Sequence, residues 1–233
     1  IFSYDHNDFG NHPNSDVGAI TLAHPGTLPM VSKEVIDMGM KLGISLGGRI
    51  NRNLIFDRKN YFYPDLPKGY QITQDATPIC KGGIVKIRSD DFPHFDIELT
   101  KIHLEEDAGK SIHVQNTDFT NVDLNRSGVP LVEIVTEPVI TSSEQAGLCL
   151  IELRKLVRYL GISDGNMEQG SLRCDANISV RLPGAPLGSK VEVKNMNSIK
   201  NVRKAIDHEI ERQTKMTAAG QTIISETRTY NPE

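Results

Sequence analysis

Short runs of β-branched and other apolar residues recur along the middle of this chain, and turn-forming residues separate them. Runs of this length and composition are typical of β-strands. Segments with helical spacing of apolar residues precede, interrupt and follow them. Strands clustered between helices predict an α+β fold, with a largely antiparallel sheet and flanking helices. The strand-like runs read GIVKIR, FDIELTKIHLEE, VPLVEIVTE, SLRCDANISVRL and KVEVKN.

Three segments are predicted to be helical. The first covers residues 32–46, where apolar positions recur at helical spacing before a glycine pair. In the second, Thr141 and Glu144 form a candidate capping box, and Gly161 is a fitting stop. The third covers residues 198–219 and has one apolar stripe beside a heavily charged side. The first thirty residues are rich in loop-forming types and read as loop.

Composition narrows the class of protein. Charged residues make up 24% of the 233 residues, hydrophobic residues make up 38%, and the formal net charge is -4. These values are typical of a soluble globular protein, and the negative balance argues against indiscriminate nucleic-acid binding but allows a local basic patch. No apolar run approaches the roughly 20 residues of a membrane span. Three widely spaced cysteines predict free thiols in a reducing cytoplasm.

Several carboxylates occupy unusual places in the predicted strands. Alternate strand residues share a face, so Glu106 continues an apolar row, and Glu133 has apolar neighbours on both sides. Asp175 and Arg173 lie on the polar face of their run, as does Lys194 in its own. If the three carboxylates converge, they form an oxygen-rich site suited to Mg²⁺, and the two cations suit phosphates. The alternative is a solvated sheet face with paired acids.

Other motifs of catalysis are absent. The glycines do not match the spacing of a phosphate-binding loop, and the histidines have no partners at zinc-binding spacing. Most of the seven histidines therefore read as loop or surface residues, and His103 is given no separate role. No serine or cysteine lies in a nucleophile motif with an identifiable base. Nucleophilic catalysis by this chain has no support in its sequence.

Long motifs make the chain similar to one family. In order along the sequence they read FDRKNYFYPDLPKGYQITQ, HLEEDAGKS, DLNRSGVPLVEIVTEP, MEQGSLRCDANISV and EVKNMNSIKNVRKAIDHEIERQ. They resemble the B subunit of the tRNA-dependent glutamyl/aspartyl amidotransferases, the GatB family, from about Phe2 to Arg228. The resemblance implies a glutamine-synthetase-like cradle domain over residues 1–233, truncated at both ends.

The resemblance also implies an activity. The family's B subunit uses ATP and Mg²⁺ to phosphorylate the side-chain carboxylate of Glu on tRNA(Gln) or Asp on tRNA(Asn). A partner A subunit hydrolyses glutamine, the resulting ammonia displaces the phosphate, and a C subunit completes a heterotrimer. The expected enzyme is therefore a cytoplasmic carbon–nitrogen ligase of translation. Two alternatives are a glutamine-synthetase-like carboxylate kinase acting on a free small molecule, and a non-catalytic tRNA-binding scaffold.

Site roles follow from the family motifs. We expect metal and catalytic roles for Glu106, Glu133 and Asp175, with Glu168 as a further metal ligand. Arg173 and Lys194 are expected to contact phosphate during catalysis, and Lys59 to contribute to ATP binding. Bases of a single-stranded tRNA 3′ end stack on aromatic rings while cations meet its phosphates. For that role the expected residues, in the aromatic stretch after Asn53, are Lys59, Tyr61, Tyr63, Lys68 and Tyr70.

The chain departs from the family pattern in three ways. Many relatives hold zinc with two cysteine pairs, whose places here are occupied by Ser3, Asp5, Gly18 and Thr21, so no zinc is expected. The family's first strand would lie upstream of Ile1, and its tRNA-gripping domains would follow the cradle. We therefore expect a fragment with weak or no activity in isolation.

Overall fold

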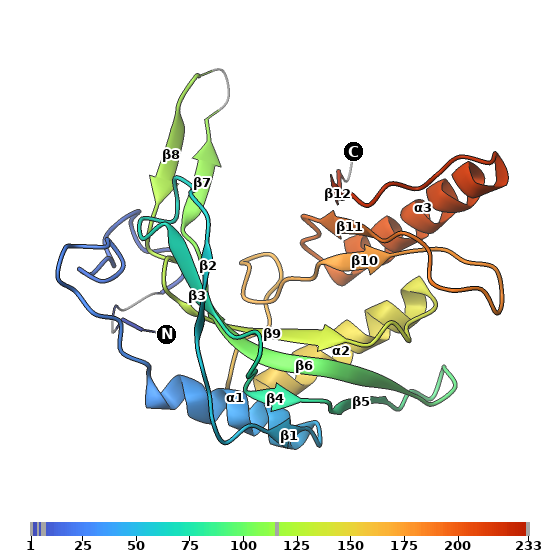
Figure 1. Cartoon of the computed structure of the whole chain (residues 1–233), viewed down its shortest axis with the longest axis horizontal. Coiled ribbons are helices and arrows are strands. Elements are labelled where there is room, and N and C mark those ends of the chain that lie inside the picture. The colour runs from blue at the N-terminus through green and yellow to red at the C-terminus, as the bar shows by residue number, and fades with distance from the viewer. Residues whose placement is uncertain (1, 4, 6–7, 115–116, 232–233) are drawn as a thin grey trace. The chain divides into compact units, whose positions relative to one another are not determined.

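The structure is a computed structural model that describes residues 2–3, 5, 8–114 and 117–231 (Figure 1). The chain forms two compact units. The first unit comprises Ile1–Ile84 and Glu98–Glu137, and the second comprises Val85–Ile97 and Pro138–Glu233. The expectation of one cradle domain over residues 1–233, like that of its glutamine-synthetase-like form, stays a prediction.

An antiparallel sheet and one helix form the centre of the first unit. The long strand β6 pairs with β4 and with β9, and β4 pairs with β1. Helix α1 contacts β1 and β4. A Cβ on Gly43 of α1 would lie 2.9 Å from the Cβ of Cys80, so glycine permits this close packing. The elements are α1 (Lys33–Ser45), β1 (Arg49–Ile50), β4 (Cys80–Lys81), β6 (Phe95–Glu106) and β9 (Pro130–Thr136); β5 (Ile84–Ile87) also joins the sheet beside β6.

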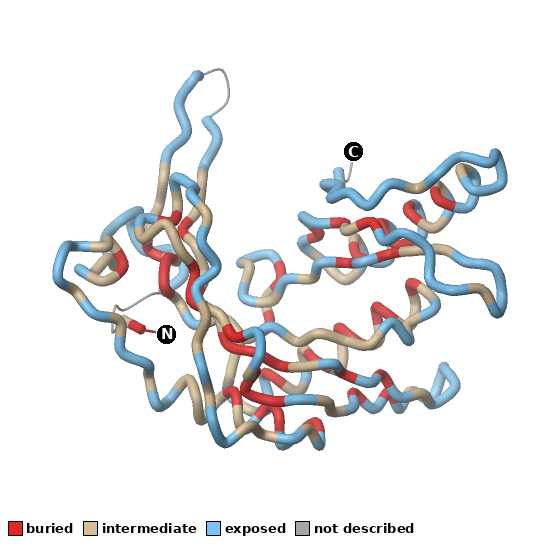
Figure 2. The backbone as a smooth tube through the Cα atoms, viewed as in Figure 1, coloured by how far each residue is buried: buried red, intermediate tan, exposed pale blue. Residues whose placement is uncertain are grey.

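Two hairpins complete the first unit. Strands β2 (Asp57–Asn60) and β3 (Tyr70–Thr73) pair antiparallel, as do β7 (Lys110–His113) and β8 (Thr120–Asp123). Figure 2 shows the outer part of the β7–β8 hairpin exposed. Phe56, just before β2, packs edge-on against Phe2, with ring centroids 5.1 Å apart.

The second unit packs two helices with a small sheet. Helix α2 contacts α3, and α3 contacts β10. The core buries the apolar face predicted for two strands, as Figure 2 shows in red, while the alternate residues face outward. β10 and β11 are antiparallel, whereas β12 is parallel to β11. The elements are α2 (Ser143–Tyr159), β10 (Ala176–Ile178), β11 (Val191–Lys194), α3 (Ile199–Ala218) and β12 (Thr227–Thr229).

These elements confirm the α+β class and the three predicted helices, within small shifts of their ends. The predicted capping box is one residue out of place, because Ser142, not Thr141, accepts a hydrogen bond from Gln145 N. The three cysteines are free thiols, as expected. Within the described part of the chain, no helix is both long and apolar enough to cross a membrane.

Candidate active site

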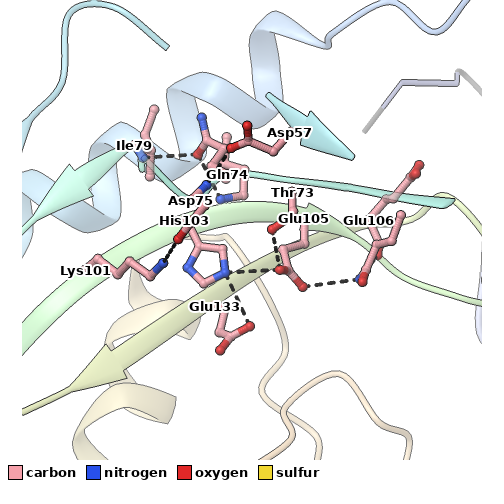
Figure 3. A network of polar contacts seen from close by, with 12 residues as sticks. Asp57, Thr73, Gln74, Asp75, Ile79, Lys101, His103, Glu105, Glu106 and Glu133 are labelled. Atoms are coloured by element: carbon pink, nitrogen blue, oxygen red, sulfur yellow. Dashed lines mark hydrogen bonds and ion pairs between the residues drawn. The ribbon is translucent and has the colours of Figure 1, made fainter. Parts of the chain in front are cut away.

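The pairing of β6 with β9 brings three ionisable side chains onto one face of the sheet. His103 lies directly opposite Glu133 in the ladder. Residues directly opposite in antiparallel strands project to the same side, and so does Glu105, two positions beyond His103. Figure 3 shows the three side chains pointing toward one another. We call His103, Glu105 and Glu133 the acid–histidine cluster.

The cluster is tightly connected. His103 Nε2 lies 3.1 Å from Glu105 Oε1 and 3.4 Å from Glu133 Oε2. Thr73 Oγ1 of β3 donates a hydrogen bond of 2.5 Å to Glu105 Oε1. The side chain of His103 is buried, that of Glu105 is 12% exposed, and that of Glu133 is 51% exposed. The cluster is thus fixed on its inner side and open at Glu133.

The carboxylates control the charge of the imidazole. Burial disfavours the charged form of His103, but the hydrogen bonds and negative charges of Glu105 and Glu133 outweigh it and raise its pKa to about 9. Burial by itself raises the pKa of Glu105. Hydrogen bonds from His103 and Thr73 outweigh burial, so the pKa of Glu105 is lowered. At neutral pH the His103 ring is therefore an imidazolium beside the side chains of Glu105 and Glu133.

The donor set of the cluster fits a cation. One ligand atom from each residue lies within 4.8 Å of the other two. Carboxylate oxygens are the ligands that Mg²⁺ prefers, and a neutral imidazole nitrogen can join them. Nε2 is the ring nitrogen of His103 that is directed at the carboxylates. The other ring nitrogen, Nδ1, is buried and has no hydrogen-bond partner among the described residues. A bound cation would take the place of the His103 proton.

Glu106, predicted to share a cation with Glu133, does not lie beside it. The register pairs Glu106 with Pro130 but Glu133 with His103, which places the two carboxylates on opposite faces of the sheet. Glu106 is only 1% exposed, and its carboxylate forms an ion pair with Lys68 and accepts a hydrogen bond of 3.0 Å from Ile72 N. In the first unit the structure thus brings Glu105, not Glu106, together with Glu133, and the metal role of Glu106 stays a prediction.

Sequence reasoning missed His103 and Glu105. The sequence pattern assigns most histidines to loops or the surface and indicates no role for His103, whereas His103 is 5% exposed in the middle of β6. The signal that could have found both residues is their spacing. A histidine and a glutamate two positions apart in a predicted strand share one face. The second acid comes from a strand more than twenty residues away, which spacing alone does not locate.

The residues predicted for the tRNA 3′ end lie on the β2–β3 hairpin but face different ways. Lys59 and Tyr63 are exposed. Lys68 faces inward, with its side chain 6% exposed and its ammonium group on Glu106. Tyr61 and Tyr70 are half-buried beneath cations: Lys59 Nζ lies 5.6 Å from the centre of the Tyr61 ring, and Lys68 Nζ lies 5.2 Å from that of Tyr70.

The second unit brings together two of its predicted site residues. Lys194 Nζ of β11 lies 2.9 Å from Asp175 Oδ2 and 3.5 Å from Glu192 Oε1. Partial burial lowers the pKa of Lys194, but Asp175 and then Glu192 raise it by more. Arg173 and Glu168, which precede Asp175 on the same stretch, are exposed. The polar face of this small sheet thus carries a fixed cation with carboxylates on either side.

Fold and site together define an α+β protein whose central strand pair carries a carboxylate–histidine site. Residues 1–233 match the family model described as the GatB/GatE catalytic domain, so the chain belongs to that family.

Curated relatives agree with that family. The chain is 48% identical over its whole length to the B subunit of the aspartyl/glutamyl-tRNA(Asn/Gln) amidotransferase of Rickettsia rickettsii (strain Sheila Smith), of which it covers 48%. It is 52% identical over 226 residues to the protein of that name from Chlorobium limicola, where the match covers 97% of the chain and 47% of the relative. The chain spans about half the length of the curated relatives it matches.

Proposed function

We propose that this chain is the catalytic domain of a cytoplasmic amidotransferase B subunit that acts on misacylated tRNA. In the proposed reaction, a side-chain carboxylate oxygen of Glu-tRNA(Gln) or Asp-tRNA(Asn) attacks the γ-phosphorus of ATP, and ADP leaves. Ammonia from glutamine hydrolysis in a partner A subunit then displaces phosphate from the acyl phosphate, and a C subunit completes the complex. The observation that carries the proposal is the family match over the entire chain.

We assign the cation of this reaction to the acid–histidine cluster. His103, Glu105 and Glu133 would hold Mg²⁺, which when bound neutralises phosphate charge. The buried ring of His103 and the hydroxyl of Thr73 both contact Glu105 Oε1 and so hold this carboxylate in one orientation. Glu133 is the member that reaches solvent, and therefore the one that an incoming ligand meets first.

The expected phosphate contacts of Arg173 and Lys194, in the second unit, and of Lys59, in the first, stay proposals for each unit by itself. Lys194 Nζ is held by Asp175 Oδ2 at 2.9 Å. Arg173 is exposed two positions before Asp175, on the segment that leads into β10. Both are suited to phosphate oxygens, because each presents several N–H donors on a positive charge. Glu106, Asp175 and Glu168 remain proposed ligands of Mg²⁺ from the family motifs. Lys59 is exposed on β2, where it could meet either ATP or tRNA phosphates.

ATP turnover by the complete amidotransferase distinguishes this function from the alternatives. We expect ADP formation to require misacylated tRNA. A carboxylate kinase for small molecules would turn over ATP with free glutamate, and a scaffold would bind tRNA without contributing to turnover. Glu133→Gln should lower turnover by about 100-fold or more, the scale of lost electrostatic stabilisation. Glu98→Gln, an exposed acid of the same strand pair, is the matched control and should not.

A further inference from the structure

The loop between β2 and β3 presents an exposed aromatic ring on a stiff support. Phe62 is 92% exposed, and its neighbour Tyr63 is 62% exposed. Tyr61 N donates a hydrogen bond of 3.2 Å to Gly69 O, and Gly69 N donates one of 3.0 Å to Leu66 O. Leu66 is buried and anchors the loop from inside. Exposed aromatic surface on a braced loop indicates an interaction site rather than a frayed segment.

Gly69, which directly precedes β3, supports this ring. A Cβ at Gly69 would lie 3.0 Å from the nearest carbon of the Phe62 ring, so the ring lies against the backbone there. Gly69 also has φ +70, which favours glycine. One side of the ring is therefore supported while most of its surface faces solvent. A rigid ring loses little conformational entropy when another flat group stacks on it.

A cation close to the loop gives this surface a preference for negative charge. Lys59 Nζ lies over the ring of Tyr61, next to Phe62, at 5.6 Å from its centre, whereas the guanidinium group of Arg58 lies over Tyr70 at 4.6 Å. Arg58 and Lys59 of β2 are exposed, whereas Asp57 and Asp65 of the same hairpin are half-buried. The Asp57 carboxylate is also occupied, because it accepts a hydrogen bond of 2.9 Å from Asp75 N. Open rings beside exposed cations are the combination that single-stranded nucleic acids require, since bases stack and phosphates pair.

We propose that Phe62 is a stacking platform for an unpaired base of the single-stranded 3′ segment of the tRNA substrate. Tyr63 extends the platform, and Lys59 contacts the adjoining phosphate. The proposal rests on the proposed function for the identity of the RNA. It adds Phe62 to the residues expected from the sequence and moves the inward-facing Lys68 out of direct contact.

Binding of a labelled tRNA to the complete amidotransferase tests the platform. The probe is tRNA with 2-aminopurine in its single-stranded 3′ segment, whose fluorescence falls on stacking. Phe62→Leu keeps an apolar side chain but removes the ring, and should weaken binding about 5- to 100-fold, the effect of about 1–3 kcal/mol of stacking. Phe62→Tyr should retain both affinity and quenching. Phe119→Leu, which removes a ring that is 77% exposed on the β7–β8 hairpin, is the matched control.

Steady-state and salt measurements sharpen the test. The platform would contact a base of the RNA and not the reacting carboxylate. Phe62→Leu should therefore raise KM for misacylated tRNA with little change in kcat. Lys59→Gln should lower the slope of log affinity against log salt by about 0.7, the value for one phosphate contact on a single strand. Phe62→Leu should leave that slope unchanged.

Three results would overturn the platform. One is unchanged affinity and quenching in Phe62→Leu. Another is a loss of tRNA affinity and quenching in Phe119→Leu equal to that in Phe62→Leu. The third is weakened assembly with the other subunits at unchanged tRNA affinity, which would make the loop a protein-docking surface. Failure of the proposed function looks different: the wild-type complex would bind and quench the probe through Phe62 yet not amidate misacylated tRNA.

Discussion

Lys68 and Glu106 form a buried ion pair between the β2–β3 hairpin and the end of β6. Ile72 N donates a second hydrogen bond to the Glu106 carboxylate, at 3.0 Å. Gln71 Nε2 donates to the backbone oxygen of Glu106 at 2.7 Å. The ion pair and these two hydrogen bonds therefore tie the β2–β3 hairpin to β6, and the Glu106 side chain lies on the face of the sheet opposite the acid–histidine cluster.

Removal of either partner of this ion pair should destabilise the first unit severely. Lys68→Met leaves a buried carboxylate without its cation, and Glu106→Leu leaves a buried ammonium group. Each should cost about 3–5 kcal/mol of unfolding free energy. The double variant should cost much less than the sum, because no charge remains buried. Urea denaturation of the four proteins measures the coupling, and strictly additive costs would show that the pair is not energetically linked.

Strands could be predicted from the sequence where buried apolar residues alternate with more exposed polar ones. Val191 and Val193 are buried, as period two requires, and so are Ala176 and Ile178. Strand β2 was not predicted, because its sequence DRKN has no apolar alternation and three of its residues are exposed. Its pairing with β3 supplies the order that local sequence does not.

The site was predictable only in part. The burial of Glu106 follows from its apolar row, but its partner is a lysine 38 positions away, which the sequence pattern does not locate. Glu105 lies one position away and faces the other side. The pairing register of β6 and β9 distinguishes the two acids, and register is a non-local property of the chain.

Acid should weaken the second unit through Glu209. Burial by itself raises the pKa of this α3 carboxylate, but hydrogen bonds from Arg212 and Gln213 leave it below its ordinary 4.5. Because the folded pKa is lowered, the stabilisation is complete above pH 4.5 and is lost as pH falls through the folded value. Glu209→Gln should cost about 1.5–3 kcal/mol at pH 7. Thermal unfolding from pH 7 to 3 should show the gap closing; a constant gap would contradict the assignment.

Gly18 should tolerate no side chain while Asp5 keeps its position. A Cβ at Gly18 would overlap Asp5 Oδ1, and Thr21 Oγ1 donates a hydrogen bond of 2.5 Å to Asp5 Oδ2. Gly18→Ala should displace Asp5, break this hydrogen bond and cost about 1–2 kcal/mol locally. Hydrogen exchange of residues 8–30 measures the loss. In an Asp5→Ala background the same change should cost little, and an undiminished cost would place the clash elsewhere.

Asp175→Asn should separate stability from activity. The pair of Asp175 and Lys194 is roughly half exposed on both sides, so its loss should change the unfolding free energy by less than about 1 kcal/mol. If Asp175 fixes Lys194 for phosphate or holds a cation, ATP-dependent amidation by the complete enzyme should fall by about 100-fold or more. Glu211→Gln breaks the exposed pair with Lys215 on α3, and as the matched control should alter neither quantity appreciably. Denaturation and amidation assays on the same preparations make the comparison. Full amidation by Asp175→Asn would remove Asp175 from the catalytic site, whereas a parallel loss of stability and activity would reduce its role to folding.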